Sequence, residues 1–243
     1  MNQISQAQLK SIIGLHRKKK RLESQLYIIE GPKMVKEALH FIPDLVENIY
    51  ATTDLFDEFN QLHTNVFTIS STQFNKISCL TNPQGILAVV ASKPKKAIST
   101  NFQLALDNIQ DPGNLGTILR TASWFGVDEI LLSENCVELY NPKVVQASMG
   151  ALFHLAIRTV SLTAYLDNVK KPIYGALLKG ESLDNSIPIK NCILVVGNEG
   201  NGISEDVKSK ITHPITISKK GSGESLNVAV ATGIILNWFK KVY

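Results

Sequence analysis

The chain has 243 residues, of which 44% are hydrophobic and 19% charged, and a net charge of +4. This composition predicts a packed globular protein of one large or two modest domains, and the mild basicity permits a polyanionic partner without demanding one. No apolar run is long enough to cross a bilayer, and the start, MNQISQAQLK, lacks the apolar stretch of a secretion signal, so we expect a cytoplasmic protein. Cys79, Cys136 and Cys192 are widely spaced in apolar surroundings, which predicts buried thiols and neither a disulfide nor a zinc framework.

The first part of the chain alternates between predicted helices and strands. Helices are predicted over residues 5–15, 33–40, 54–62 and 72–80, and strands over residues 26–29, 48–52, 66–70 and 85–91. This alternation predicts a small α/β domain over residues 1–95. The polar, proline-broken segment 92–100 marks its boundary, with a linker at residues 96–101.

The densest charge in the chain is the run HRKKKR from His16 to Arg21. A charged run is usually only a solvated face. This one lies between a predicted helix and a predicted strand, which would hold it on a folded surface. Because fixed Lys and Arg clusters neutralise phosphates and release counterions, the run favours nucleic-acid binding.

The second part of the chain predicts an α/β domain over residues 102–243. Strands are predicted over residues 102–109, 128–132, 155–160, 173–178, 193–197 and 214–218, and helices over residues 114–124, 141–153, 165–170 and 226–240. Asn114 and Ser225 are the expected caps of the first and last of these helices. The last helix is apolar nearly all round, and we expect Ile235, Trp238 and Phe239 to need cover from a second subunit, which predicts a homodimer.

Two Gly-rich loops follow hydrophobic strands, at residues 197–202 and 219–224. Nucleotide-binding α/β folds place ligands at such strand ends, and glycine allows a ligand to approach the main chain. For the first loop alone, a plain connector is an equal alternative. Arg120 lies off the apolar stripe of its predicted helix, near a Pro-Gly-Asn start, where a phosphate is favoured.

Three segments at βα junctions carry a family resemblance. They are NIQDPGNLGTILRTA, VVGNEGNGIS and ITISKKGSGESLNVAVA. In this order they resemble the three motifs of the SpoU (TrmH-type) RNA ribose methyltransferases of the SPOUT, or α/β-knot, superfamily. NPKVVQASMG resembles the ribosomal-RNA branch of that family, and GLHRKKKRLESQLYIIEGPKMVKEAL resembles its small, ribosomal-protein-like substrate-binding domain. The loop at residues 219–223 is more basic than the family pattern.

The resemblance implies an open parallel sheet with a C-terminal trefoil knot, two subunits that pack through the knot, and S-adenosylmethionine as cofactor. General topology rules disfavour knots, so the residues alone would not predict one. By motif position, the expected cofactor-binding residues are Leu177, Val196, Gly197, Ile217 and Leu226. The expected RNA-binding residues are Arg17, Lys18, Lys19, Lys20, Arg21 and Lys33.

The implied reaction is methyl transfer to a ribose 2'-hydroxyl, in ribosomal RNA by the branch resemblance, with transfer RNA as the alternative. The expected catalytic residues are Asn114, Arg120, Glu199, Ser225 and Asn227. Arg120 is expected to bind the neighbouring phosphate and lower the pKa of the hydroxyl, since Arg stays protonated. For Ser225 and Asn227, helix capping is an alternative role.

Two other classes of protein fit the sequence less well than a methyltransferase does. A nicotinamide enzyme is disfavoured because no G-x-G-x-x-G follows a first strand. A non-catalytic RNA-binding or assembly protein on the same scaffold is disfavoured because all three motifs are intact.

Overall fold

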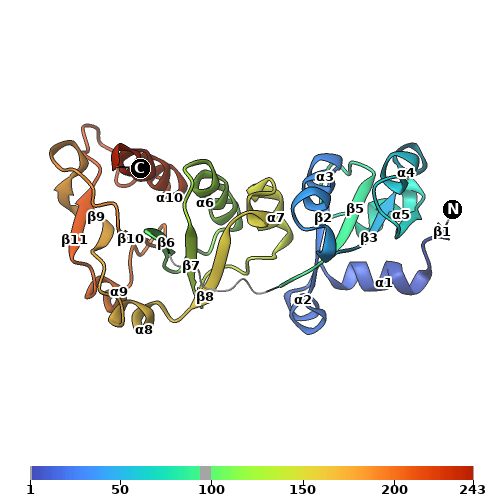
Figure 1. Ribbon diagram of the computed structural model, residues 1–243, viewed down its shortest axis with the longest axis horizontal. Helices are drawn as coiled ribbons and strands as arrows, with labels where there is room; N and C mark the ends of the chain where they lie inside the picture. Colours follow the sequence, from blue (N-terminus) through green and yellow to red (C-terminus); the bar gives the residue numbers. More distant parts are fainter. Residues whose placement is uncertain (1, 94–99, 243) are drawn as a thin grey trace. The chain divides into compact units, whose positions relative to one another are not determined.

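The computed structural model describes residues 2–93 and 100–242, which form two compact units (Figure 1). Unit 1 holds the chain up to Lys93 together with Glu138–Phe153, and unit 2 holds the rest. The sequence predicted domains over residues 1–95 and 102–243; in the structure, residues 138–153 pack within unit 1. The predicted linker at residues 96–101 lies outside the described residues except for Thr100 and Asn101.

Unit 1 is a mixed five-stranded sheet with helices around it. The strand order is β1-β4-β3-β5-β2, in which β5 is antiparallel to both of its neighbours and the other pairs are parallel. The strands are β1 (Asn2–Gln3), β2 (Leu26–Glu30), β3 (Val46–Ala51), β4 (Val66–Thr68) and β5 (Ile86–Ala91). The helices are α1 (Gln6–Gly14), α2 (Lys18–Ser24), α3 (Pro32–Phe41), α4 (Thr53–Asn60), α5 (Ser71–Ile77) and α7 (Pro142–Ser148), with short 3-10 turns at Pro43–Leu45 and Ala151–Phe153.

Local sequence explains where two helices of unit 1 begin. Ser5 and Ser70 each start a capping box. The Ser hydroxyl accepts from the backbone N–H of the Gln three residues later, and the side chain of that Gln accepts from the backbone N–H of the Ser. The basic run, in contrast, forms the helix α2, which the charge pattern did not predict. The two-residue strand β1 was also missed, because its pairing with β4 is a long-range contact.

Residues 138–153 belong to unit 1 because they pack on β2. The Tyr27 and Tyr140 rings stack with centroids 4.4 Å apart, and the buried Arg21 forms an ion pair with Glu138. These partners are more than a hundred residues apart in sequence, so no local pattern could have assigned the segment.

Unit 2 is a six-stranded, fully parallel sheet in the order β11-β9-β10-β6-β7-β8. The strands are β6 (Phe102–Leu106), β7 (Glu129–Ser133), β8 (Ala156–Val160), β9 (Ile173–Ser182), β10 (Cys192–Val196) and β11 (His213–Thr216). The helices are α6 (Pro112–Trp124), α8 (Leu162–Asp167), α9 (Glu205–Lys208) and α10 (Val228–Phe239), with 3-10 turns at Leu183–Asn185 and Lys240–Val242.

Helices cover both faces of this sheet (Figure 1). On one face, Ala105, Leu131, Ile193 and Val195 form a core with side chains of α8 and α9. Because strand side chains alternate between faces, the intervening residues point to α6 and α10, as the 4.8 Å contact between the Phe102 and Phe239 rings shows. Strands buried on both faces read as the continuous hydrophobic runs seen in the sequence.

The final helix corrects one expectation. Ile235, Trp238 and Phe239 are 2%, 4% and 1% exposed, so unit 2 itself covers them. The indole Nε1 of Trp238 also donates to the carbonyl oxygen of Ser186 at 3.2 Å. The large hydrophobic residues of α10 that stay exposed are Val230 and Ile234, at 53% and 41%.

The cysteines differ partly from the prediction. Cys192 is buried and Cys136 half-buried, but Cys79 is exposed, and all three are free thiols. Within residues 2–93 and 100–242, no group of His, Cys, Asp and Glu side chains is arranged to hold a metal ion. No helix in the described part of the chain has the length and apolar character needed to span a bilayer.

Candidate active site

Three loops of unit 2 are joined by side-chain hydrogen bonds at the carboxyl ends of the strands. Asn114 Nδ2 donates to Glu199 Oε1 at 2.8 Å, and Asn227 Nδ2 donates to Asn114 Oδ1 at 2.9 Å. We call this chain of bonds the Asn114 relay. It links residues from all three sequence motifs, so the structure brings three of the five expected catalytic residues together.

The orientation of each amide in the relay is fixed by its other partners. Asn227 Oδ1 accepts from the backbone N–H groups of Ala229 and Val230 at 2.9 and 3.3 Å, which turns its Nδ2 toward Asn114. An ionised Glu199 carboxylate can only accept a hydrogen bond, so the Asn114 atom that faces it must be the donor, Nδ2. The relay therefore runs in one direction, from Asn227 through Asn114 to Glu199.

The two helix starts at the site differ from the sequence prediction. Asp111 caps α6 by accepting from Asn114 N at 2.8 Å, and Pro112 takes the first helical position, so the Asn114 side chain is free for the relay. Asn227 caps α10, whereas Ser225 lies exposed before the helix and is not its cap. Asn227 thus caps α10 and also donates to Asn114.

The Gly-rich loop at residues 197–202 folds back on itself. Asn198 Oδ1 accepts from Gly200 N and Asn201 N at 2.9 and 3.0 Å, and Asn198 Nδ2 donates to Asn108 O at 2.8 Å. A Cβ on Gly197 would lie 2.3 Å from the carbonyl carbon of Gly202, so only glycine fits there. The loop is therefore held in one shape against the first motif.

Residues that the sequence analysis did not single out support this arrangement. Asp107, 2% exposed, accepts from the backbone N–H of Ser204 through Oδ2 at 2.8 Å. Asn108 has a φ of 57°, a conformation in which Asn is several-fold enriched among residues other than glycine. The sequence signal for these two residues was a polar pair directly after a buried strand. Their hydrogen-bond partners lie about ninety residues away in the chain, so the sequence could not identify them.

Arg120 is exposed on α6 and is not hydrogen-bonded to Asn114, Glu199 or Asn227 in the described residues. It follows Asn114 by six positions, which is about 9 Å along a helix axis. As predicted, the opposite stripe of α6, Leu115, Ile118, Leu119 and Ala122, is fully buried. Arg120 is thus free to meet a ligand from solvent.

The expected cofactor residues lie at strand ends with mixed exposure. Val196 and Gly197 are buried at the end of β10, and Leu226 is 51% exposed directly before Asn227. Leu177 is half-buried and lies in an irregular part of β9. The pairing with β11 shifts register there: Pro214 pairs with Gly175, but the next residue, Ile215, pairs with Glu181.

Ile217 lines a hollow of about 310 Å³ that the other four expected cofactor residues do not line. The hollow also contains Asp184, whose carboxylate accepts from Ser218 Oγ at 2.6 Å and from Ser182 Oγ at 3.3 Å. These bonds, with the nearby Lys220 and Lys241, lower the pKa of Asp184.

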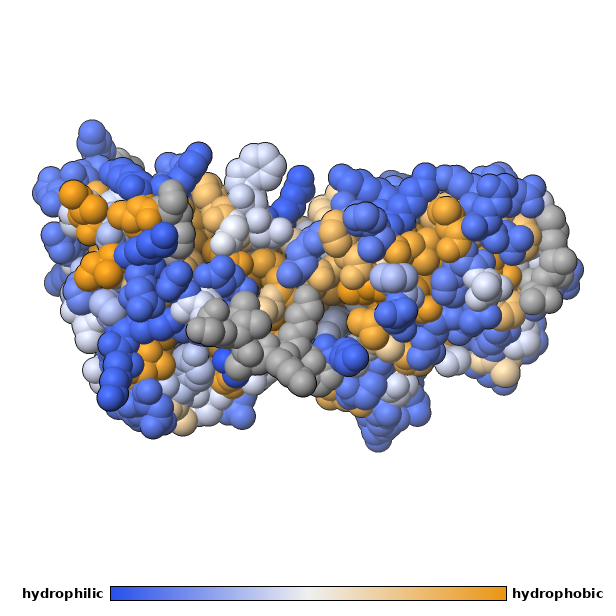
Figure 2. Space-filling model, viewed as in Figure 1, coloured by the Kyte–Doolittle hydropathy of each residue, from blue (hydrophilic) through white to orange (hydrophobic). Residues whose placement is uncertain are grey.

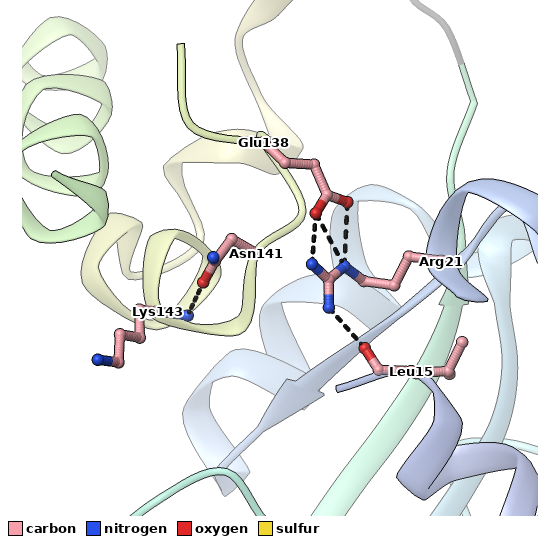
Figure 3. Close-up of polar contacts among 5 residues, drawn as sticks. All are labelled: Leu15, Arg21, Glu138, Asn141 and Lys143. Atoms are coloured by element: carbon pink, nitrogen blue, oxygen red, sulfur yellow. Dashed lines mark hydrogen bonds and ion pairs between the residues drawn. The ribbon is translucent and has the colours of Figure 1, made fainter. Parts of the chain in front are cut away.

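The expected RNA-binding residues of unit 1 divide into two groups. Arg17, Lys18, Lys19, Lys20 and Lys33 are exposed, with Lys20 Nζ 2.8 Å from the Glu23 carboxylate. Arg21 is 4% exposed: its Nε donates to Glu138 at 3.0 Å, its Nη2 pairs with the same carboxylate, and its Nη1 donates to Leu15 O at 2.7 Å (Figure 3). Arg21 is thus held by structural contacts within unit 1, and its expected contact with RNA stays a prediction.

The fold and the relay together define an α/β protein whose polar groups gather at the carboxyl ends of a parallel sheet, where such folds bind ligands. The chain belongs to the SpoU rRNA Methylase family, whose sequence model matches residues 101–237. The model of the MRM3-like substrate binding domain matches residues 6–88. These matches confirm the family that the three motifs predicted.

Relatives with names or solved structures cover nearly the whole chain. The 23S rRNA (guanosine(2553)-2'-O)-methyltransferase RlmP of Bacillus subtilis is 32% identical over 228 residues, which are 91% of each chain. A solved putative RNA methyltransferase of the TrmH family from Porphyromonas gingivalis is 37% identical, with a TM-score of 0.89 and 99% of each chain covered. An AdoMet-bound rRNA methyltransferase from Sinorhizobium meliloti, 24% identical, has the same fold, with a TM-score of 0.85 over 99% of this chain and 97% of that one.

Proposed function

We propose that the protein transfers a methyl group from S-adenosylmethionine to a ribose 2'-hydroxyl in ribosomal RNA. The observation that carries this proposal is the Asn114 relay, which joins the three motifs of a SpoU family member at the carboxyl ends of β6 and β10. The name of the Bacillus subtilis relative, a 23S rRNA 2'-O-methyltransferase, supports ribosomal RNA as the substrate.

The residues at the strand ends fit an adenosine-type cofactor. Leu226 offers an apolar surface, and it adjoins Asn227, which the relay connects to the loop after Val196 and Gly197. Apolar walls with backbone hydrogen-bonding groups are the usual lining of such a site. When bound, the cofactor supplies a methyl group activated by a positive sulfonium.

The side chains of the site have separate tasks in this proposal. Arg120 binds a phosphate of the acceptor strand, and its fixed charge stabilises the developing ribose oxyanion. Glu199 is the ionisable member of the relay, and Asn114 fixes one of its oxygens, so Glu199 is placed to receive the hydroxyl proton. Asn227 holds Asn114, and Ser225 lies in the adjoining loop as part of the cofactor or ribose contact.

The path of the chain supports a knot around the cofactor loops. After β11, at the edge of the sheet, the chain returns to Asn227 beside Asn114, and α10 packs on α6. The returning segment therefore passes the loop at residues 197–202.

We include in the proposal a homodimer through the exposed side of α10 and action in the cytoplasm. Figure 2 shows hydrophobic groups at the surface of unit 2 over β9, β11 and α10.

Replacement of Arg120 tests the proposal. Arg120→Ala is expected to slow methyl transfer roughly a hundredfold, because a fixed charge-assisted contact is lost, while cofactor affinity is retained. Arg120→Lys is expected to rescue only weakly, since an ammonium lacks the planar fork. The measurement is single-turnover methylation of ribosomal RNA with labelled cofactor, beside a cofactor titration and a melting curve.

Lys170→Ala, which removes an exposed cation elsewhere in unit 2, is the matched control and should react at the parental rate. A folded Arg120→Ala protein with parental activity would contradict the assignment. If the parent protein binds S-adenosylmethionine but methylates no RNA, the non-catalytic alternative replaces the proposal.

A further inference from the structure

Trp124 is an exposed aromatic residue that the proposed reaction does not use. It ends α6 and is 86% exposed, the largest fraction among the exposed large hydrophobic residues described in the chain. The other tryptophan, Trp238, is 4% exposed and hydrogen-bonded. One indole is thus integrated in the core of unit 2, and the other is presented to solvent.

The position of Trp124 on α6 places it beside Arg120. The exposed residues Gly113, Thr117, Arg120 and Trp124 follow one another at intervals of three or four, so they form one stripe, which we call the α6 stripe. It begins next to Asn114 of the relay and contains no acidic residue. The buried stripe on the other side of the same helix fixes the direction in which the α6 stripe faces.

A cation followed one turn later by an exposed indole matches the chemistry of a single RNA strand. Arg binds phosphate through its planar fork, and aromatic rings stack on bases of any sequence. Four helical residues rise about 6 Å. A strand whose phosphate lies at Arg120 can therefore place the base of the same or the adjacent nucleotide on the indole.

The surroundings of Trp124 fit RNA better than a protein partner. The other exposed positions of the α6 stripe are glycine, threonine and arginine, whereas the core of a protein interface is a contiguous apolar patch. The exposed apolar residues Val230 and Ile234 lie on the neighbouring helix α10, where a Cβ added to Gly233 would lie 3.6 Å from Cγ2 of Thr121.

We propose that Trp124 stacks on a base next to the nucleotide that is methylated, so that α6 binds the acceptor strand through both a phosphate and a base. This inference rests on the proposed function, because it takes RNA as the substrate. It makes Trp124 a substrate-positioning residue that sets which base is preferred beside the target.

Fluorescence quenching tests the stacking directly in the full chain. Because Trp238 is buried, acrylamide should quench mainly Trp124 in the free protein. Oligoadenylate should then protect Trp124 and quench its emission, whereas an abasic ribose-phosphate oligomer of equal length should bind without protecting it. Emission that is already shielded from acrylamide without RNA would overturn the inference, since a protein surface would then cover the indole.

Two variants show whether an aromatic ring at position 124 is what binds the base. Trp124→Ala should bind oligoadenylate roughly tenfold more weakly, and Trp124→Phe should stay within about threefold of the parent. The affinity of both variants for the abasic oligomer and for S-adenosylmethionine should be unchanged. Equal oligoadenylate affinity of Trp124→Ala and the parent would overturn the inference.

Methylation of ribosomal RNA distinguishes failure of this inference from failure of the proposed function. Trp124→Ala should lower kcat/KM for RNA mainly through KM. An active parent with an equally active Trp124→Ala variant refutes only the stacking. A parent that binds cofactor without methylating refutes the function, while the quenching result still decides whether Trp124 binds bases.

Discussion

At the scale of single residues, Asn114 makes a pair of bonds that depend on its amide. It accepts from Asn227 through Oδ1 and donates to Glu199 through Nδ2. An aspartate of the same shape could accept but could not donate, and it would place a second negative charge beside Glu199. The relay therefore depends on amide chemistry as well as on shape.

Replacement of Asn114 tests the relay. Asn114→Asp and Asn114→Ala are both expected to lower the single-turnover methylation rate about a hundredfold, because Glu199 loses its fixed orientation. Asn168→Ala, which removes an exposed amide that bonds to Ala164 O on α8, is the control and should retain the parental rate. Parental activity of Asn114→Asp would show that the amide donor is not needed.

Glu30 predicts a pH dependence of stability in unit 1. Burial raises the pKa of this carboxyl, although bonds from Ser78 Oγ and from Cys79 N at 2.7 Å oppose the shift. A raised pKa in the folded state means that folding favours the protonated acid. The stability from Glu30 is then fully present below its unfolded pKa, near 4.5, and is lost as pH rises through the folded value.

Hydrogen exchange of β2 and β5 peptides at a series of pH values measures this effect. Relative to Glu30→Gln, which does not titrate, the parent should become progressively less protected as pH increases from about 4.5 toward neutrality. A constant difference between the two proteins across that range would show that Glu30 keeps an ordinary pKa.

The sequence predicted the relay residues but not the bonds between them. Asn114, Glu199 and Asn227 were found because each lies in a recognisable motif at a strand end. Their contacts span 85 and 113 positions, so no local pattern could show which side chain holds which. The helix caps were misplaced for a similar reason. Asp111 and Asn227 are cap-forming residue types, as Asn114 and Ser225 are, and only the backbone conformation shows where each helix begins.

At the scale of elements, α2 combines a solvent-facing charge cluster with one buried cation. Lys18, Lys19 and Lys20 are exposed, but Arg21 points inward to Glu138, which lies 117 positions further along the chain. The sequence placed the charge on a surface correctly. It could not separate Arg21 from its neighbours, because the carboxylate that pairs with Arg21 is far away in the chain and no local pattern shows it.

Replacements within α2 should therefore have opposite consequences. Arg21→Ala is expected to destabilise unit 1 by about 3–5 kcal/mol, since it leaves the Glu138 carboxylate nearly buried without its partner. The triple change of Lys18, Lys19 and Lys20 to Ala should leave stability nearly unchanged, weaken RNA binding and flatten its salt dependence.

Thermal unfolding and RNA titrations at several salt concentrations measure the two effects. An unchanged RNA affinity and salt slope in the triple variant would remove α2 from the RNA-binding surface. An Arg21→Ala protein as stable as the parent would instead show that Arg21 is not needed to pair with Glu138 and is available to bind RNA, like the neighbouring lysines.

At the scale of the whole molecule, the predicted fold class and the family hold, while the reason for a dimer changes. The sequence attributed the need for a partner to Ile235, Trp238 and Phe239, which are covered within unit 2. An apolar pattern around a whole helix shows that most sides are covered, but it does not show which layer covers each side. The structure leaves Val230 and Ile234, one turn apart on α10, as the apolar residues open to a second copy.

Sedimentation of the full chain tests this surface. The parent is expected to be a dimer at micromolar concentration, and the double variant Val230→Glu with Ile234→Glu is expected to weaken the dimer at least a hundredfold, because two carboxylates of each subunit would be desolvated in the interface. Folding should survive, since both side chains are about half exposed. Leu62→Glu, at an exposed position of unit 1, is the matched control and should remain dimeric. A monomeric parent would remove the homodimer, and a double variant that dimerises like the parent would assign the interface to another surface.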